Sequence, residues 1–241
     1  MSIKRRAAES SKTPSARIAL SCVLVVFAVL ASLTLLGGNA LQNQPPSSSG
    51  HQLVVLLDLN ANQRKVLPVE QMLARGVIEE LDRPVNVFSV ITFGSEPPAL
   101  LKSSVHADEA IAAVRDVRPE PTGTEHGSPH LYDALNLAFG QFTLDARAKS
   151  LLIITEGNDY ARAKVFKHTV SRAQQLHASC DVALVADHTF YGSKAIQRYG
   201  FYLRELAGKT RAQYVEVGAW QKKVPPSVDR ISKSILAQGQ D

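Results

Sequence analysis

Residues 52–62 read QLVVLLDLNAN, a sequence that indicates a buried strand followed by a polar loop. Its first part, residues 52–58, is an almost unbroken apolar run that ends at Asp58. A short continuous run of this kind is typical of a strand that is buried on both faces, as in parallel sheets covered by helices. Three oxygen-bearing side chains, Asp58, Asn60 and Asn62, then follow at alternate positions just past the strand.

Outward from this stretch, strand-like and helix-like segments alternate along the chain. Further strands are expected at 86–93, 99–102 (a short edge strand), 150–155, 181–186 and 213–217. Helical periodicity is expected at 68–81, 107–117, 131–142, 161–178, 196–208 (ending at a Gly208 cap) and 225–236. The alternation predicts an α/β domain over residues 51–237, with a doubly wound, mostly parallel sheet flanked by helices.

The N-terminal region predicts a membrane segment. Residues 18–36 read IALSCVLVVFAVLASLTLL without a charged side chain, and as a helix they extend about 28 Å, close to the thickness of a bilayer core. We expect a basic cytoplasmic tail at 1–17, a transmembrane signal anchor at 18–37 and a polar linker at 38–50. The flanking bases all precede the segment, which predicts a single-pass protein with its domain outside the cytoplasmic membrane. The alternative is a signal peptide cleaved near Ala40, which would release a secreted protein.

The charge distribution argues against a nucleic-acid-binding domain. Residues 1–17 hold five bases and one acid, so the remaining chain carries 22 bases and 21 acids out of totals of 27 and 22. The basic character therefore belongs to the tail, and no nucleic-acid partner is expected. The two cysteines, Cys22 and Cys180, cannot form a disulfide framework, and Cys180 is expected to be a small buried apolar residue.

Oxygen-bearing side chains cluster in three loops that should meet at one edge of the sheet. Besides the loop after Asp58, residues 155–159 read TEGND after a predicted strand, and residues 122–128 read TGTEHGS before a predicted helix. In doubly wound sheets, ligands bind at the carboxyl ends of the strands. Oxygen ligands from several loops suit a hard divalent cation such as Mg²⁺.

These motifs resemble those of a von Willebrand factor A domain. The resemblance rests on DLNAN at 58–62, LYDAL at 131–135 and LLIITEGND at 151–159, and it covers about residues 52–217. It is closest to the bacterial branch that pairs an N-terminal export segment with one such domain. The resemblance implies a non-enzymatic, protein-binding module with a protein partner, which uses a metal ion-dependent adhesion site for Mg²⁺, or for Mn²⁺ or Ca²⁺.

The family's site uses an Asp-x-Ser-x-Ser motif, a threonine from a second loop and an aspartate from a third. Asp58 matches the first aspartate, whereas asparagines stand in place of both serines and a glutamate in place of the last aspartate. Two residues of the second loop compete for the threonine position. The resemblance therefore implies a degenerate metal site formed by Asp58, Asn60, Asn62, Thr124 or Ser128, and Glu156.

Three other interpretations of these residues remain open. The strand-end side chains can be capping and turn residues, which Asp, Asn and Ser favour at helix starts. The same edge can also serve a metal-free interaction module. An enzymatic alternative is a metal-dependent phosphoester hydrolase with Asp58 as its nucleophile, although Asn60 stands where a second carboxylate is wanted.

Overall fold

The computed structural model describes residues 50–59, 65–119, 130–157, 163–186, 193–218 and 224–238. The chain divides into two units, Met1–Ser47 and Ser48–Asp241, and all described residues lie in the second. The predicted membrane segment at 18–37 therefore lies outside the described residues. Within the described ranges, no helix is both long and apolar enough to span a bilayer.

Six strands form one sheet in the order β3-β2-β1-β4-β5-β6. All neighbouring pairs are parallel except β2 and β3, which are antiparallel. The strands are β1 (His51–Asp58), β2 (Val87–Phe93), β3 (Ala99–Ser104), β4 (Ala148–Thr155), β5 (Ala178–Ala186) and β6 (Tyr214–Gly218). The predicted edge strand at 99–102 is confirmed as β3, and the sheet is mostly parallel as expected.

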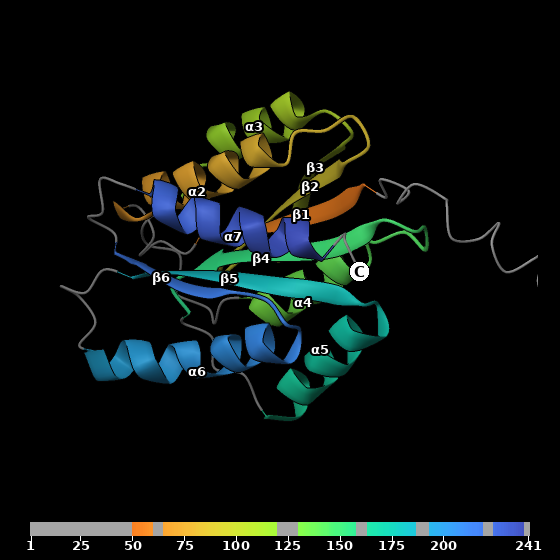
Figure 1. Ribbon diagram of the computed structural model, residues 1–241. Coiled ribbons are helices and arrows are strands. Elements are labelled where there is room, and N and C mark those ends of the chain that lie inside the picture. The colour runs from red at the N-terminus through yellow and green to blue at the C-terminus, as the bar shows by residue number, and fades with distance from the viewer. Residues whose placement is uncertain are drawn as a thin grey trace, which may run out of the picture. The chain divides into compact units, whose positions relative to one another are not determined.

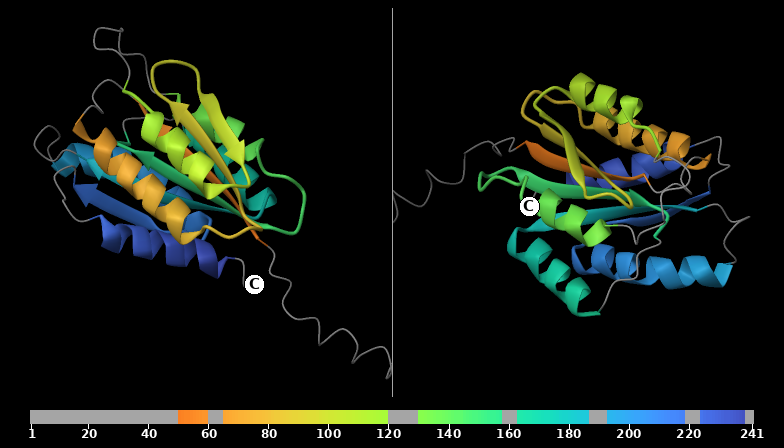
Figure 2. Two further views of the ribbon diagram at one scale, coloured as in Figure 1. Left: turned by 90° about the horizontal axis from the view of Figure 1, so that it is seen from above. Right: turned by 180° about the vertical axis from the view of Figure 1, so that it is seen from behind.

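Helices cover both faces of this sheet (Figures 1 and 2). One face carries α2 (Leu67–Glu80), α3 (Ala107–Asp116) and α7 (Pro225–Ala237), and the other carries α4 (Leu131–Phe139), α5 (Ala163–Gln175) and α6 (Ser193–Lys209). The doubly wound α/β architecture predicted from the sequence is confirmed.

The central strand β1 is buried along its whole length, as its apolar run predicts. Leu53, Val55 and Leu57 pack into the core on the side of α2, whereas Val54 and Leu56 pack into the core on the side of α4. Successive side chains of a strand point to opposite faces, so this one run contributes to both apolar layers. Burial on both sides fixes the strand's register and with it the position of Asp58.

Three predicted helix ends are wrong. The helix expected over 131–142 ends at Phe139. The helix expected over 161–178 ends at Gln175, because His177 adopts a left-handed backbone (φ 52°) and Ala178 already starts β5. Gly208 is not a cap, because α6 continues to Lys209. The left-handed residue is instead Arg211 (φ 57°), and the N–H of Ala212 donates to the carbonyl of Ala207 at 2.9 Å. This is a Schellman ending built without glycine.

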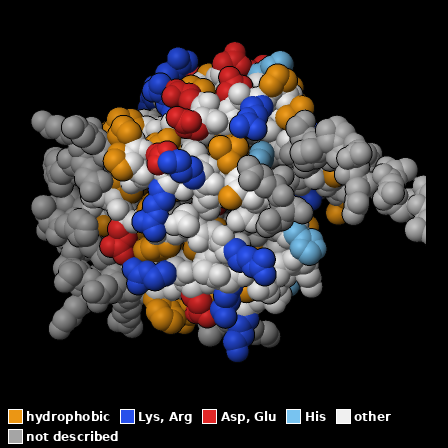
Figure 3. Space-filling model, in the orientation of Figure 1, with side chains coloured by type: hydrophobic (Ala, Val, Ile, Leu, Met, Phe, Trp, Pro, Cys, Tyr) orange, Lys and Arg blue, Asp and Glu red, His pale blue; other side chains and the backbone are white. Residues whose placement is uncertain are grey.

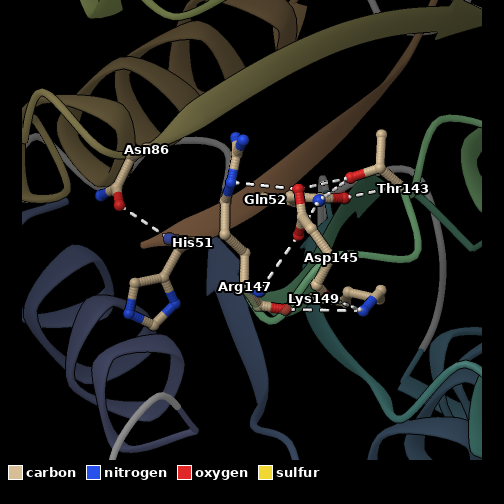
Figure 4. Close-up of polar contacts among 7 residues, drawn as sticks. All are labelled: His51, Gln52, Asn86, Thr143, Asp145, Arg147 and Lys149. Atoms are coloured by element: carbon tan, nitrogen blue, oxygen red, sulfur yellow. Dashed lines mark hydrogen bonds and ion pairs between the residues drawn. The ribbon is translucent and has the colours of Figure 1, made fainter. Parts of the chain in front are cut away.

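At the amino end of the sheet, polar side chains fasten the start of β1 to its neighbours (Figure 4). Gln52 donates to Asp145 Oδ1 at 2.7 Å and to the hydroxyl of Thr143, and its Oε1 accepts the N–H of Thr143 at 2.9 Å. On the other side, His51 donates its N–H to Asn86 Oδ1 at 2.7 Å. The first residues of β1 are therefore tied both to the loop before β4 and to the loop before β2.

Candidate functional site

The carboxyl ends of β1 and β4 meet at the centre of the sheet. Leu57 pairs with Ile154, so Asp58 lies beside Thr155 at the ends of the two strands. From β1 the chain passes through α2 to β2 on one side of β1, whereas β4 pairs on the other side. The order in which strands are added to the sheet therefore reverses between the parallel strands β1 and β4, and such a switch point is where open α/β sheets bind ligands.

Two acidic residues predicted to be site residues are buried at this point. Asp58 is 1% exposed and Glu156, which directly follows β4, is 6% exposed. The hydroxyl of Thr155 donates to Asp58 Oδ2 at 2.7 Å and accepts the N–H of Gly157 at 3.0 Å. Thr155 thus fixes the Asp58 carboxylate and the turn that carries Glu156 in one chain of hydrogen bonds. We refer to Asp58, Thr155 and Glu156 as the strand-end site.

We expect Thr155→Val to lower the free energy of unfolding by about 1–3 kcal/mol, because it removes a buried donor to the carboxylate of Asp58 without changing the side chain's shape. Thr155→Ser keeps the hydroxyl and serves as the matched control. Urea denaturation of both variants measures the difference. Equal stability of the valine and serine variants would mean that the hydrogen bond to Asp58 contributes nothing.

The remaining predicted site residues, Asn60, Asn62, Thr124 and Ser128, lie outside the described residues. The described residues do show where the second loop ends. The N–H of His130 donates to the carbonyl of Gly94, the residue after β2, at 2.9 Å. Similarly, the N–H of Leu59 donates to the carbonyl of Phe93 at 2.7 Å. The residues that follow β1, follow β2 and precede α4 are thus joined at one edge of the sheet.

Gln71 on α2 fixes the end of α3, a role that the sequence analysis did not predict. Its Nε2 lies 2.9 Å from the carbonyl oxygen of Val114, 3.3 Å from that of Arg115 and 3.2 Å from that of Val117. The last carbonyl groups of a helix have no partner within the helix, so one amide side chain satisfies several of them here. In the sequence, this role of Gln71 is indicated only by its place as a polar residue next to the apolar face of α2.

Glu70 is a third buried acid near the strand-end site, and the sequence analysis missed it. It lies in the first turn of α2 and is 0% exposed. Burial raises the pKa of Glu70 well above its ordinary value, and the negative charges of Asp58 and Glu156 raise it further. Neither carboxyl oxygen has a hydrogen-bond partner among the described residues. The sequence does indicate the burial of Glu70, because this residue lies on the same face of the helix as the apolar residues Leu73, Ala74 and Val77.

Of the predicted ligands, the described residues include the two buried acids Asp58 and Glu156. Among the described residues, no three His, Cys, Asp or Glu side chains are close enough together to hold a metal ion. A cation bound by Asp58 and Glu156 would need further ligands of the kind predicted at Asn60, Asn62, Thr124 or Ser128. The chemistry of the donors fits a hard cation, because they are oxygens and Glu70 adds an unpartnered buried acid.

Neither Cys180 nor the surface of α2 and α7 has the features of a binding site. Cys180 is fully buried, as expected, and burial raises its pKa to about 12, so the thiol is unreactive. On the face formed by α2 and α7, basic and acidic side chains of the described residues are interspersed (Figure 3). A mixed surface of this kind creates no extended field of one sign.

Comparisons with solved structures identify the fold. An aerotolerance-related membrane protein from Bacteroides fragilis superposes with a TM-score of 0.61 at 14% identity, covering 78% of this chain and 99% of that one. The SpRpn10 VWA domain gives 0.52 at 10% identity, covering 78% and 94%. Manganese-loaded TRAP protein from Plasmodium vivax gives 0.55 at 17% identity, covering 78% and 74%. No family model and no curated protein matches the sequence.

Proposed function

The chain has the von Willebrand factor A fold predicted from its sequence, and we propose that on this fold it is an exported or membrane-anchored module that binds a protein partner. The observation that carries the proposal is the strand-end site. Two buried acids, Asp58 and Glu156, meet at the switch point of the sheet, where ligands of open α/β sheets bind.

We further propose that this site holds a divalent cation, Mg²⁺ or alternatively Mn²⁺ or Ca²⁺. Buried carboxylates are costly unless a positive charge or hydrogen bonds compensate them, and a cation provides the charge. The ligands would be Asp58 and Glu156, completed by Asn60, Asn62, Thr124 or Ser128. The solved structure of TRAP, which has this fold, is described as manganese-loaded. When bound, the cation would leave a position for a carboxylate of the partner.

Membrane anchoring is proposed from the sequence. The apolar run at 18–36 and the bases before it would place the domain outside the cytoplasmic membrane, with cleavage near Ala40 as the alternative. One protein with this fold is described as an aerotolerance-related membrane protein. An intact mass in the membrane fraction would support the anchor, whereas a soluble product that starts after Ala40 would support cleavage.

A metal-free interaction module is the second candidate function. The observation that favours it is that, among the described residues, no three His, Cys, Asp or Glu side chains lie close enough together to hold a metal ion. A hydrolase that uses Asp58 as its nucleophile is less favoured. The Asp58 carboxylate accepts a hydrogen bond from Thr155, and Asn60 stands where the hydrolase would need a second carboxylate.

Calorimetric titration distinguishes the first two candidates. We expect the full chain, purified in detergent, to bind Mg²⁺ or Mn²⁺ saturably, and Asp58→Asn to weaken binding at least about 100-fold, because it removes a charged ligand. The matched control is Asp116→Asn, which neutralises an exposed aspartate at the end of α3. No cation binding by the wild type would leave the metal-free module. Equal weakening of cation binding in both variants would mean that the loss reflects the net charge of the protein and not a ligand at Asp58.

A further inference from the structure

Glu70 is difficult to explain as a packing residue. It is fully buried on the core face of α2, between Leu67 and Leu73, where an apolar side chain would pack without loss. Burying a carboxyl group without hydrogen bonds is unfavourable even in its neutral form. Residues that are unfavourable for stability and have strongly shifted pKa values concentrate at functional sites.

Comparison with the other buried acids shows how unusual Glu70 is. Asp58 accepts a hydrogen bond from Thr155, and Asp181 accepts one from the backbone N–H of Gln213 at 2.9 Å. For Glu70, neither oxygen has a partner among the described residues. A donor outside the described residues is therefore expected to provide hydrogen bonds to this carboxyl group.

The position of Glu70 indicates what that partner is. The first turn of α2 follows β1 through residues 59–66, so Glu70 lies at the carboxyl end of the sheet. The acids that act on Glu70 electrostatically are Asp58 of β1 and Glu156 after β4. The three acids nevertheless do not form a group that can ligate one ion directly. Glu70 is thus near the strand-end site, and it does not join both Asp58 and Glu156 as a third ligand of one ion.

We infer that Glu70 is a positioning residue of the strand-end site, whose buried carboxylate accepts hydrogen bonds from water bound to a divalent cation held by Asp58 and Glu156. The inference rests on the proposed function and adds a residue to it. Mg²⁺ in proteins keeps several of its waters, which need acceptors of this kind. Groups that hold metal-bound ligands in place typically change metal affinity about 10- to 100-fold.

Glu70→Gln tests the inference, with Glu80→Gln as the matched control on an exposed position of the same helix. Mn²⁺ is titrated into the full-length protein in detergent by calorimetry, and the melting temperature is measured with and without Mn²⁺. We expect Glu70→Gln to weaken Mn²⁺ binding about 10- to 100-fold. Its melting temperature without metal should equal or exceed that of the wild type, while the increase caused by Mn²⁺ is reduced. Glu80→Gln should behave like the wild type.

Each other result overturns the inference in a distinguishable way. Equal Mn²⁺ affinity of Glu70→Gln and the wild type removes Glu70 from the site but leaves the proposed function intact. A lower melting temperature of the metal-free variant, together with weaker binding, would indicate a role in packing alone. If the glutamine variant does not fold, Glu70→Met provides the same comparison, because it places an apolar side chain of similar length at this buried position. Absence of Mn²⁺ binding by the wild type would reject the cation site itself.

Discussion

Asp181→Asn is expected to raise the free energy of unfolding by about 3 kcal/mol at neutral pH and to flatten its dependence on pH between about 4 and 6. Asp181 is fully buried in β5, where Oδ1 accepts the N–H of Gln213. Burial raises its pKa from 3.8 to about 6, although the Gln213 N–H and the Ser234 hydroxyl act in the opposite direction.

The sign of this pH effect on stability follows from the higher pKa of Asp181 in the folded state. Because the folded protein binds the proton more tightly than the unfolded chain, the stability contribution of Asp181 is fully present below about pH 4. It is lost as the pH rises through about 6, where the buried carboxyl group must ionise. An asparagine stays neutral and keeps an oxygen for the Gln213 N–H, so the variant should not show this loss.

Urea denaturation of the wild type and Asp181→Asn across this pH range checks the prediction. Other titrating groups, such as His51 with its lowered pKa, are common to both proteins and cancel in the difference. Asp229→Asn is the control, since Asp229 is an exposed residue of α7. Parallel stability curves for the wild type and Asp181→Asn would show that this carboxyl group does not titrate on unfolding.

Gly50→Ala should destabilise the domain by about 2–3 kcal/mol, because a methyl group there collides with backbone. A Cβ at Gly50 would lie 2.2 Å from the carbonyl oxygen of Val85, and a carbonyl cannot rotate away as a side chain can. The same carbonyl precedes Asn86, whose side chain accepts the N–H of His51 and donates to the carbonyl of Leu81 at 2.6 Å. The collision would therefore disturb the start of β1 as well.

Gly208→Ala is the contrasting variant for this prediction. Nothing lies within 4 Å of a Cβ at Gly208, and the residue is exposed within α6. Alanine favours the helix over glycine, so this variant should be as stable as the wild type or more stable by up to about 1 kcal/mol. Thermal or urea denaturation of both variants gives the comparison. Similar stabilities for the two alanine variants would contradict the close approach at Gly50.

The sheet could be predicted from the sequence because its strands are buried on both faces. Residues 53–57 and 151–154 are apolar at every position, so the local sequence alone identifies each run as a buried strand. The end of α6 could not be predicted, because it depends on a left-handed backbone conformation that the composition does not reveal. Arg211 takes the left-handed position that glycine usually occupies, and the sequence analysis chose Gly208 instead.

The candidate site could be predicted only in part, because some of its residues lie at strand ends and others lie on a helix whose packing the sequence does not show. Asp58 and Glu156 follow buried strands, so the pairing of β1 with β4 was sufficient to bring them to one edge. Glu70 and Gln71 lie on a helix, where their roles depend on how α2 packs against the sheet and α3. Polar residues within an apolar periodicity are therefore worth examining as site residues before a structure is known.

The central claim, a divalent cation at the strand-end site, is tested most directly by crystals of the full-length protein grown with Mn²⁺. Anomalous scattering locates the ion without reference to the rest of the map. The proposed function predicts a peak in direct contact with carboxylate oxygens of Asp58 and Glu156, which disappears in crystals of Asp58→Asn. A peak elsewhere on the protein, or no peak at saturating Mn²⁺, would contradict it.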